Sequence, residues 1–182
     1  MEATSKALTL RLLREKIGAI DGAQEKPRSK FTLLSEGFPL GTLIEVKGHG
    51  KTECVVQFLK EHLATNSEFR VAWVEKEMTL NPFAILQRGL KLEQILFIEA
   101  PREGLWALQQ LLQSQCFQSI VVSGFEFDFR ELRRFQMLNE RSQGHFFILT
   151  NEFHESWVPQ LQIEVRRNAE GPLKISIHRS RG

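Results

Sequence analysis

Residues 43–52 read Leu-Ile-Glu-Val-Lys-Gly-His-Gly-Lys-Thr, an apolar strand that runs directly into a glycine turn and the start of a helix. The phosphate-binding loop has the pattern G-x-x-x-x-G-K-[ST], in which backbone amides between the two glycines surround a phosphate. Here Gly50-Lys51-Thr52 fits the end of that pattern, but only His49 separates Gly50 from Gly48, so the loop is three residues short. The stretch predicts a phosphate-loop type of turn with too few amides to enclose a triphosphate.

Apolar runs and helical patterns alternate along the chain from residue 31 onward. Strands are predicted at 43–47, 70–75, 94–99, 119–123 and 145–150, with helices at 51–64, 82–88, 103–114 and 130–141. Continuous apolar strands separated by helices are typical of a parallel sheet covered on both faces. Residues 160–166 and 172–178 alternate in polarity around a short connection at 168–171, which indicates an antiparallel hairpin. The predicted fold is α/β, a doubly wound and mostly parallel sheet with an antiparallel C-terminal edge.

The first thirty residues differ from the rest. Residues 5–19 place Leu8, Leu12, Leu13 and Ile17 on one stripe, the spacing of an amphipathic helix. Residues 21–30 are polar and interrupted by glycine and proline, which indicates a linker. The chain is therefore divided into an arm over 1–30 and a core domain over 31–182. The arm is predicted to dock on the core or on another molecule, including a second copy.

Composition excludes several classes of protein. The 182 residues are 42% hydrophobic with a net charge of +2 and a pI near 8.6, so no global basic field argues for nucleic-acid binding. Cys54 and Cys116 lie in apolar helix-like runs and are predicted to be buried thiols. No CxxC or HExxH pattern supports a metal site, and no apolar run approaches the length of a membrane span. These features predict a cytoplasmic protein without a membrane partner.

Three segments together carry a family resemblance. Residues 38–48 (Phe-Pro-Leu-Gly-Thr-Leu-Ile-Glu-Val-Lys-Gly) lead into the glycine turn, and residues 71–82 form the next strand with a turn that contains Glu77. Leu-Arg-Arg-Phe-Gln at 132–136 precedes the strand at 146–149. These segments resemble the bacterial RecA recombinase and, more closely, the ImuA family of its small relatives in inducible mutagenesis. The likeness covers roughly residues 8–181 and implies a RecA-like sheet.

The resemblance implies roles for the residues at the turn. Gly48, Gly50 and Lys51 would contact phosphate, Thr52 would be a Mg²⁺ ligand, and Glu77 would polarise the attacking water. If no nucleotide binds, Glu77 is instead expected to be a capping or surface carboxylate. His49 is expected to be a solvated residue at the tip of the turn.

Two further positions depart from the family pattern. Ser123 stands where the family has the aspartate that holds the metal, and Glu126 and Asp128 lie beyond the strand end. Asn151-Glu152 stands where RecA has the Asn-Gln pair that senses the γ-phosphate. The expectation is a pseudo-ATPase without a resident cofactor, in which ATP and Mg²⁺ bind weakly at most.

The expected contacts with nucleic acid and partners come from loops and basic residues. The connections at 124–129 and 153–159 are much shorter than the DNA-binding loops of a recombinase, so strand exchange is not expected. The helix at 130–141 carries arginines that are taken for a solvated face. Trp106 is expected to lie in the core, and Trp157 to be an exposed anchor for a partner. A phosphate-backbone, subunit or partner contact is predicted for a C-terminal basic set: Arg166, Arg167, Lys174, His178, Arg179 and Arg181.

The family resemblance implies an accessory role in the SOS response to DNA damage. Such a protein would support DNA repair by error-prone translesion synthesis, bridging the RecA-type recombinase to a translesion polymerase or its inactive paralogue. One alternative is an active ATP-dependent, DNA-binding ATPase of the same superfamily, with Lys51, Thr52 and Glu77 in its active site. Another is a simple DNA-binding module that uses the basic C-terminus.

Overall fold

The computed structural model describes residues 27–167 and 171–180. The predicted arm helix at 5–19 and most of the predicted linker lie outside these residues. The strands are β1 Arg28–Phe31, β2 Leu34–Pro39, β3 Thr42–Lys47, β4 Val71–Glu75, β5 Ile95–Glu99, β6 Ser119–Ser123, β7 His145–Leu149, β8 Leu161–Arg167 and β9 Leu173–Ser180. The helices are α2 Lys51–Thr65, α3 Pro82–Gln87, the 3₁₀ turn η1 Leu92–Gln94, α4 Gly104–Ser114 and α5 Phe129–Ser142.

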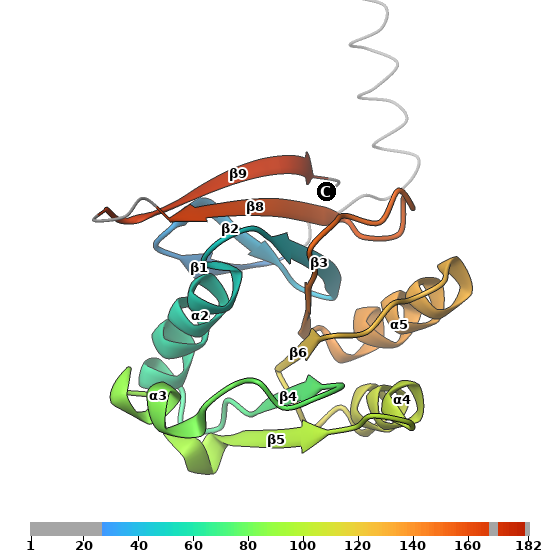
Figure 1. The fold of residues 1–182 in the computed structure, drawn as a ribbon, viewed down its shortest axis with the longest axis horizontal. Helices are drawn as coiled ribbons and strands as arrows, with labels where there is room; N and C mark the ends of the chain where they lie inside the picture. Colours follow the sequence, from blue (N-terminus) through green and yellow to red (C-terminus); the bar gives the residue numbers. More distant parts are fainter. Residues whose placement is uncertain (1–26, 168–170, 181–182) are drawn as a thin grey trace, which may run out of the picture.

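Seven strands form one sheet in the order β5-β4-β6-β7-β3-β8-β9, and every pairing is parallel except the antiparallel β8-β9. Helices α2 and α3 lie on one face and α4 and α5 on the other (Figure 1). The chain leaves β3 in one direction along the sheet through α2 and returns through α4 and α5. This arrangement is the predicted α/β sheet with helices on both faces and an antiparallel edge, and it is compatible with a doubly wound fold.

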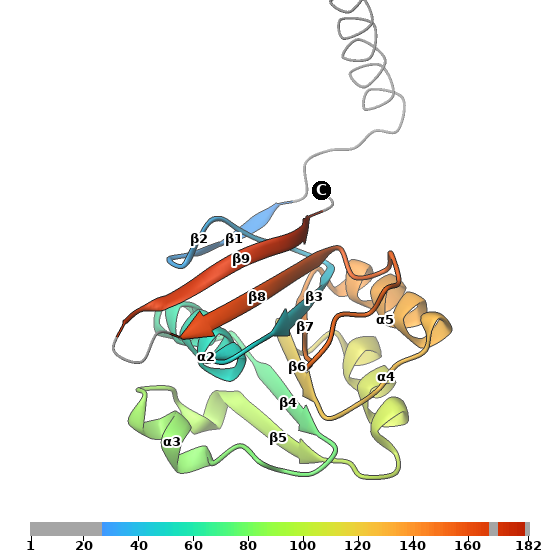
Figure 2. The same ribbon diagram turned by 45° about the horizontal axis from the view of Figure 1, so that its top comes forward.

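A small antiparallel hairpin of β1 and β2 was not predicted. It packs against the α2 side of the sheet, next to the β8-β9 edge (Figure 2). The predicted linker over 21–30 is therefore wrong at its end, because β1 begins at Arg28. Phe31 and Phe38 from this hairpin stack at 5.2 Å between ring centroids, and Phe38 lies 5.0 Å from Phe58 of α2.

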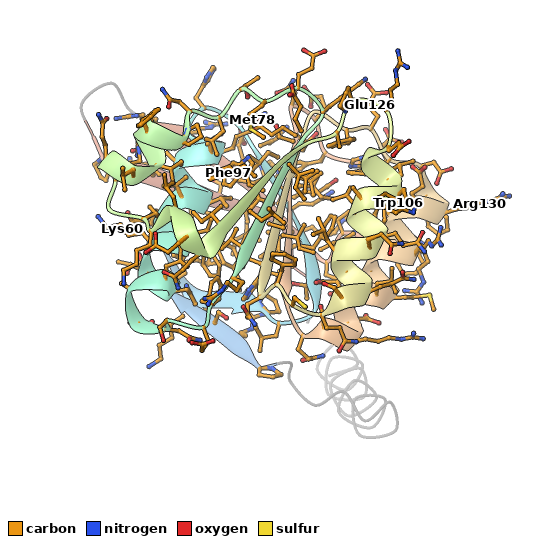
Figure 3. The ribbon with its side chains drawn as sticks, turned by 90° about the horizontal axis from the view of Figure 1, so that it is seen from below. Lys60, Met78, Phe97, Trp106, Glu126 and Arg130 are labelled. Carbon is orange, nitrogen blue, oxygen red and sulfur yellow. The ribbon has the colours of Figure 1, made fainter. Side chains whose placement is uncertain are left out.

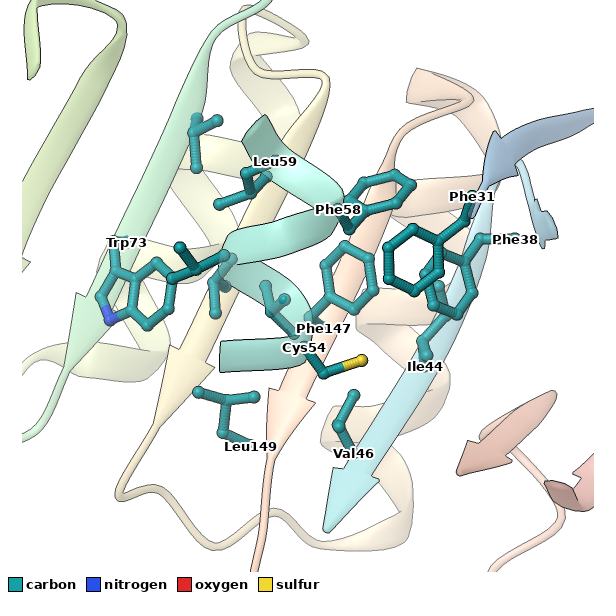
Figure 4. Packing of buried hydrophobic residues seen from close by; sticks show 14 of the residues in the cluster. Phe31, Phe38, Ile44, Val46, Cys54, Phe58, Leu59, Trp73, Phe147 and Leu149 are labelled. Atoms are coloured by element: carbon teal, nitrogen blue, oxygen red, sulfur yellow. The ribbon is translucent and has the colours of Figure 1, made fainter. Parts of the chain in front are cut away.

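The sheet separates two hydrophobic cores. The larger core joins the β1-β2 hairpin, α2 and one face of the sheet around a phenylalanine cluster. Figure 4 shows Cys54 beside this cluster and Trp73 further along the sheet. The smaller core lies under α4 and α5 and is built around Leu108, Leu132 and Phe146. Both faces of the sheet are therefore closely packed against helices, so the sheet is a rigid platform for the loops at its ends.

Two side chains differ from their predicted environments. Trp106 was expected in the core, but it is 62% exposed because the buried stripe of α4 runs through Leu108, Leu111 and Leu112 instead. Cys54 is buried as predicted, whereas Cys116 is exposed. Cys116 lies just beyond Gln115, the residue that ends α4 in a left-handed conformation, so it is outside the helix.

None of the helices in the described residues has the length and apolar character needed to cross a membrane.

His145 is a buried imidazole at the start of the central strand β7. Neither of its ring nitrogens makes a well-formed hydrogen bond among the described residues, although the backbone of Phe38 and Gln118 lies close enough to act on its pKa. Its ring lies 4.9 Å from that of Phe58. Burial lowers the pKa of His145 to about 3, with nearby His62 as a second cause. The folded protein therefore keeps the His145 imidazole neutral. Below pH 6.5 this side chain binds a proton more readily in the unfolded chain than in the folded protein.

We expect this difference to make stability fall with acid. The contribution of His145 is fully present above pH 6.5 and is lost as pH falls towards 3, with a slope of at most about 1.4 kcal/mol per pH unit. Urea unfolding at several pH values should show a flatter dependence for His145→Leu, with His49→Leu on the exposed turn as the control. An unchanged slope in His145→Leu would contradict this assignment.

Candidate functional site at the carboxyl edge of the sheet

The carboxyl ends of β6, β7 and β3 meet at one edge, because these strands are parallel neighbours. The loops that follow them enclose a pocket of about 520 Å³. Its polar lining includes Lys51, Ser123, Glu126, Asn151, Glu152 and His154. Parallel sheets commonly bind ligands at this edge, so the predicted site residues are expected around this pocket.

The glycine turn is tight and backed by a neighbouring strand. Gly48 and Gly50 have φ values of 97° and 105°, and Gly50 ends the turn as the N-cap of α2 without a side-chain cap. A Cβ added to Gly48 would lie 2.3 Å from the carbonyl oxygen of Val165 in β8. The Lys51 amide lies 3.3 Å from the Gly48 carbonyl oxygen, and the Cys54 amide donates to that of Gly50 at 2.8 Å. The turn therefore bonds to itself and packs against β8.

The Lys51 ammonium is held by the end of β7. Its Nζ donates to the carbonyl oxygen of Thr150 at 2.9 Å and to Oδ1 of Asn151 at 2.7 Å. Burial lowers the pKa of Lys51. The predicted phosphate lysine and the predicted sensor asparagine thus bind each other and join α2 to the loop after β7. Two of the three ammonium donors are thus engaged, so a phosphate could use only the third unless one of these bonds is displaced.

Glu77 is exposed, and a different carboxylate organises the turn that carries it. Glu75 is buried at the end of β4 and accepts hydrogen bonds from the Trp73 indole at 2.9 Å and from the Leu80 amide at 3.1 Å. The Thr79 amide and hydroxyl also donate to it. Glu75 is not among the site residues predicted from the sequence, although its place at the end of a buried apolar run was a signal that it needs partners.

The carboxylates near Ser123 do not gather around a metal-sized space. Asp128 caps α5, accepting from the Glu131 amide at 2.8 Å while the Glu131 side chain accepts from the Asp128 amide. Glu126 lies in the exposed loop at the edge of the pocket (Figure 3). Within 27–167 and 171–180, no group of three or more His, Cys, Asp or Glu side chains is placed to hold a metal ion.

A buried polar group that sequence reasoning missed lies behind His154, which lines the pocket. Glu45 in β3 has no exposed surface; its Oε1 pairs with Nδ1 of His154, and its Oε2 accepts from Nε2 of Gln162 at 2.6 Å. Gln162 also donates to the carbonyl oxygen of His154 at 2.9 Å. This group fixes the loop after β7 across β3 and β8. The hydrogen bond to Glu45 raises the pKa of His154.

We expect Glu45→Gln to lower the pKa of His154 towards that of a free imidazole. Because the folded pKa lies above 6.5, the pair stabilises the protein fully below pH 6.5 and loses its contribution as pH rises through the folded pKa. Titration of the His154 ring resonances by NMR in both proteins measures the shift. A wild-type His154 that titrates below 6.5, or the same pKa in the variant, would be the opposite result.

The predicted basic set is divided by the hairpin. Arg166 and Lys174 are cross-strand partners on the polar face of β8-β9. Arg167 points to the other face and pairs with Glu53 at 2.7 Å. Arg179 donates to the carbonyl oxygen of Ser156, and Arg181 lies outside the described residues. The hairpin therefore does not present all of these residues as one basic surface.

The loop after β7 continues to Trp157, which is 49% exposed as expected. Its ring lies 5.8 Å from Phe129 at the start of α5, and the Arg133 guanidinium stands 5.3 Å from its centre. Lys47 pairs with Glu152 at 3.5 Å and lies over the Phe153 ring at 4.6 Å, which ties the first half of the loop to β3.

Comparison with protein-family models and with curated proteins found no match to this chain.

Proposed function

We propose that this chain is a RecA-like accessory protein of the SOS response to DNA damage, acting in the cytoplasm without ATP turnover. The pathway comes from the family resemblance, which extends to translesion synthesis through contacts with a RecA-type recombinase and a translesion polymerase or its paralogue. The parallel sheet with a glycine turn after β3 and an antiparallel C-terminal edge is compatible with that resemblance.

The observation that carries the proposal is that the Lys51 ammonium is hydrogen-bonded within the protein. Its ammonium is bound by Thr150 and Asn151, and the turn before it packs against Val165 instead of forming an open cradle. Ser123 supplies no charge for Mg²⁺, and Glu152 pairs with Lys47 beside the site. A site with these features favours a protein that acts through its surface on a rigid core.

The proposal is tested by binding measurements with the purified recombinase and the translesion polymerase of the same organism. We expect the chain to bind at least one of them without nucleotide, and Lys51→Ala to bind equally well. Trp157→Ala should weaken binding, whereas Trp106→Ala, which alters another exposed tryptophan, should not. No binding to either protein, or binding that requires Mg-ATP and is lost in Lys51→Ala, would overturn the proposal.

A further inference from the structure

Helix α5 carries a face that the site described above does not use. Its exposed side combines arginines with large apolar side chains around a groove of about 410 Å³. The residues of this α5 face are Phe129, Arg130, Arg133, Arg134, Met137 and Arg141. Figure 3 shows Arg130 extending outward from α5, on the same side of the sheet as α4.

The arginines of the α5 face lack acidic partners. Among the described residues none of them pairs with a carboxylate, whereas five other arginines do: Arg28, Arg70, Arg88, Arg166 and Arg167. The two glutamates of α5 are directed elsewhere. Glu131 belongs to the N-terminal capping box, and Glu140 accepts from Gln136 at 2.8 Å. The face therefore concentrates positive charge that the fold itself does not neutralise.

The apolar side chains of the α5 face are also left exposed to solvent. Phe129 and Trp157 are each 49% exposed, and Met137 is 46% exposed. Phe129 and Trp157 contact each other, and Arg133 lies over the indole, so this end is ordered before any partner arrives. Positions 130, 133, 134, 137 and 141 recur at helical spacing and extend over roughly 16 Å of the helix.

We infer that the α5 face binds an acidic segment of a partner protein that carries apolar anchor side chains. Carboxylates would pair with the arginines at the rim, and the anchors would cover Phe129, Met137 and Trp157. A phosphate backbone would use the arginines but leave the exposed methionine and phenylalanine uncovered, so the apolar floor favours a peptide over a nucleic acid. The inference rests on the proposed binding role and specifies the chemistry of its partner.

Selection from a random peptide library of about 12 residues, displayed on phage, tests this inference with the full chain as bait. We expect enriched peptides to combine Asp or Glu with Leu, Phe or Trp. Synthetic copies should lose roughly tenfold or more in affinity for Arg130→Glu/Arg134→Glu and for Met137→Asp. The matched charge control, Arg166→Glu/Lys174→Glu on the hairpin, should bind as the wild type does, and circular dichroism should show every variant folded.

Other outcomes overturn the inference. They are no enrichment, enriched peptides without acidic residues, or affinities that the α5 variants leave unchanged. Binding of an oligothymidylate that falls in Arg130→Glu/Arg134→Glu and is not displaced by the peptides would assign the face to nucleic acid instead. Peptides that bind away from α5 would contradict the inference about the α5 face but not the proposed accessory role. Tight binding of Mg-ATP would contradict the proposed role without bearing on peptide binding at the α5 face.

Discussion

Gly48→Ala should lower the free energy of unfolding by about 3 to 5 kcal/mol. Two costs add at this position. The residue has a φ of 97°, which strains a residue with a Cβ, and that Cβ would stand 2.3 Å from the Val165 carbonyl oxygen. The obstacle is the backbone of β8, which is paired with β9 at this point, so relief would require the turn and β8 to move apart. Urea unfolding followed by circular dichroism measures the loss.

Gly89→Ala is the matched control for the Gly48 variant. Gly89 also has a positive φ, of 85°, but its added Cβ would meet only the end of the Lys60 side chain at 3.8 Å. Its expected cost is therefore about 1 kcal/mol, from the backbone alone. Equal losses in the two variants would show that the turn does not press on β8 as described.

Glu75→Ala should cost about 3 kcal/mol. The substitution leaves the buried Trp73 indole and the amides of Thr79 and Leu80 without their acceptor. Glu75→Gln retains one acceptor oxygen and should cost roughly half as much. Glu77→Ala, two residues further along the same turn but exposed, should change stability by less than about 0.5 kcal/mol.

Chemical denaturation of these three variants distinguishes the two glutamates. The expected order of stability places Glu77→Ala beside the wild type, Glu75→Gln below it and Glu75→Ala lowest. A larger loss at Glu77 than at Glu75 would mean that the turn after β4 is organised by the exposed carboxylate. The NMR line widths of residues 76–80 should increase in Glu75→Ala, because that carboxylate holds the turn closed.

The pattern of apolar residues in the sequence was sufficient to predict the parallel sheet. Buried strands such as Val71–Glu75 and His145–Leu149 are apolar on both faces, so they appear as continuous apolar runs. Helix α5 was equally visible, since Leu132 and Phe135 repeat at the spacing of one buried face. The glycine turn after β3 also follows directly from the printed residues.

The β1-β2 hairpin could not be read from the sequence in the same way. Strand β1 has only four residues, three of them the polar Arg28-Ser29-Lys30, so a period of two has no room to appear. Its position depends on Phe31 and Phe38 packing against Phe58, which lies in α2. Trp106 is a different case, because the helical phase of Leu108, Leu111 and Leu112 already placed it off the buried stripe.

The buried polar contacts of the candidate site depend on tertiary structure. Glu45 and His154 are far apart in the sequence, and only the crossing of the β7-β8 loop over β3 brings them together. The bond between Lys51 and Asn151 likewise requires β3 and β7 to be neighbours in the sheet. Sequence patterns identify such residues as unusual but do not indicate which partners satisfy them.

We propose that the turn before α2 does not hold a magnesium nucleotide, because it is short, packed on β8 and already bonded through Lys51. Isothermal titration calorimetry of the full chain with a non-hydrolysable ATP analogue and Mg²⁺ measures this directly. We expect no saturable heat up to millimolar analogue, and the same trace for Lys51→Ala. Micromolar binding to the wild type that disappears in Lys51→Ala would contradict it.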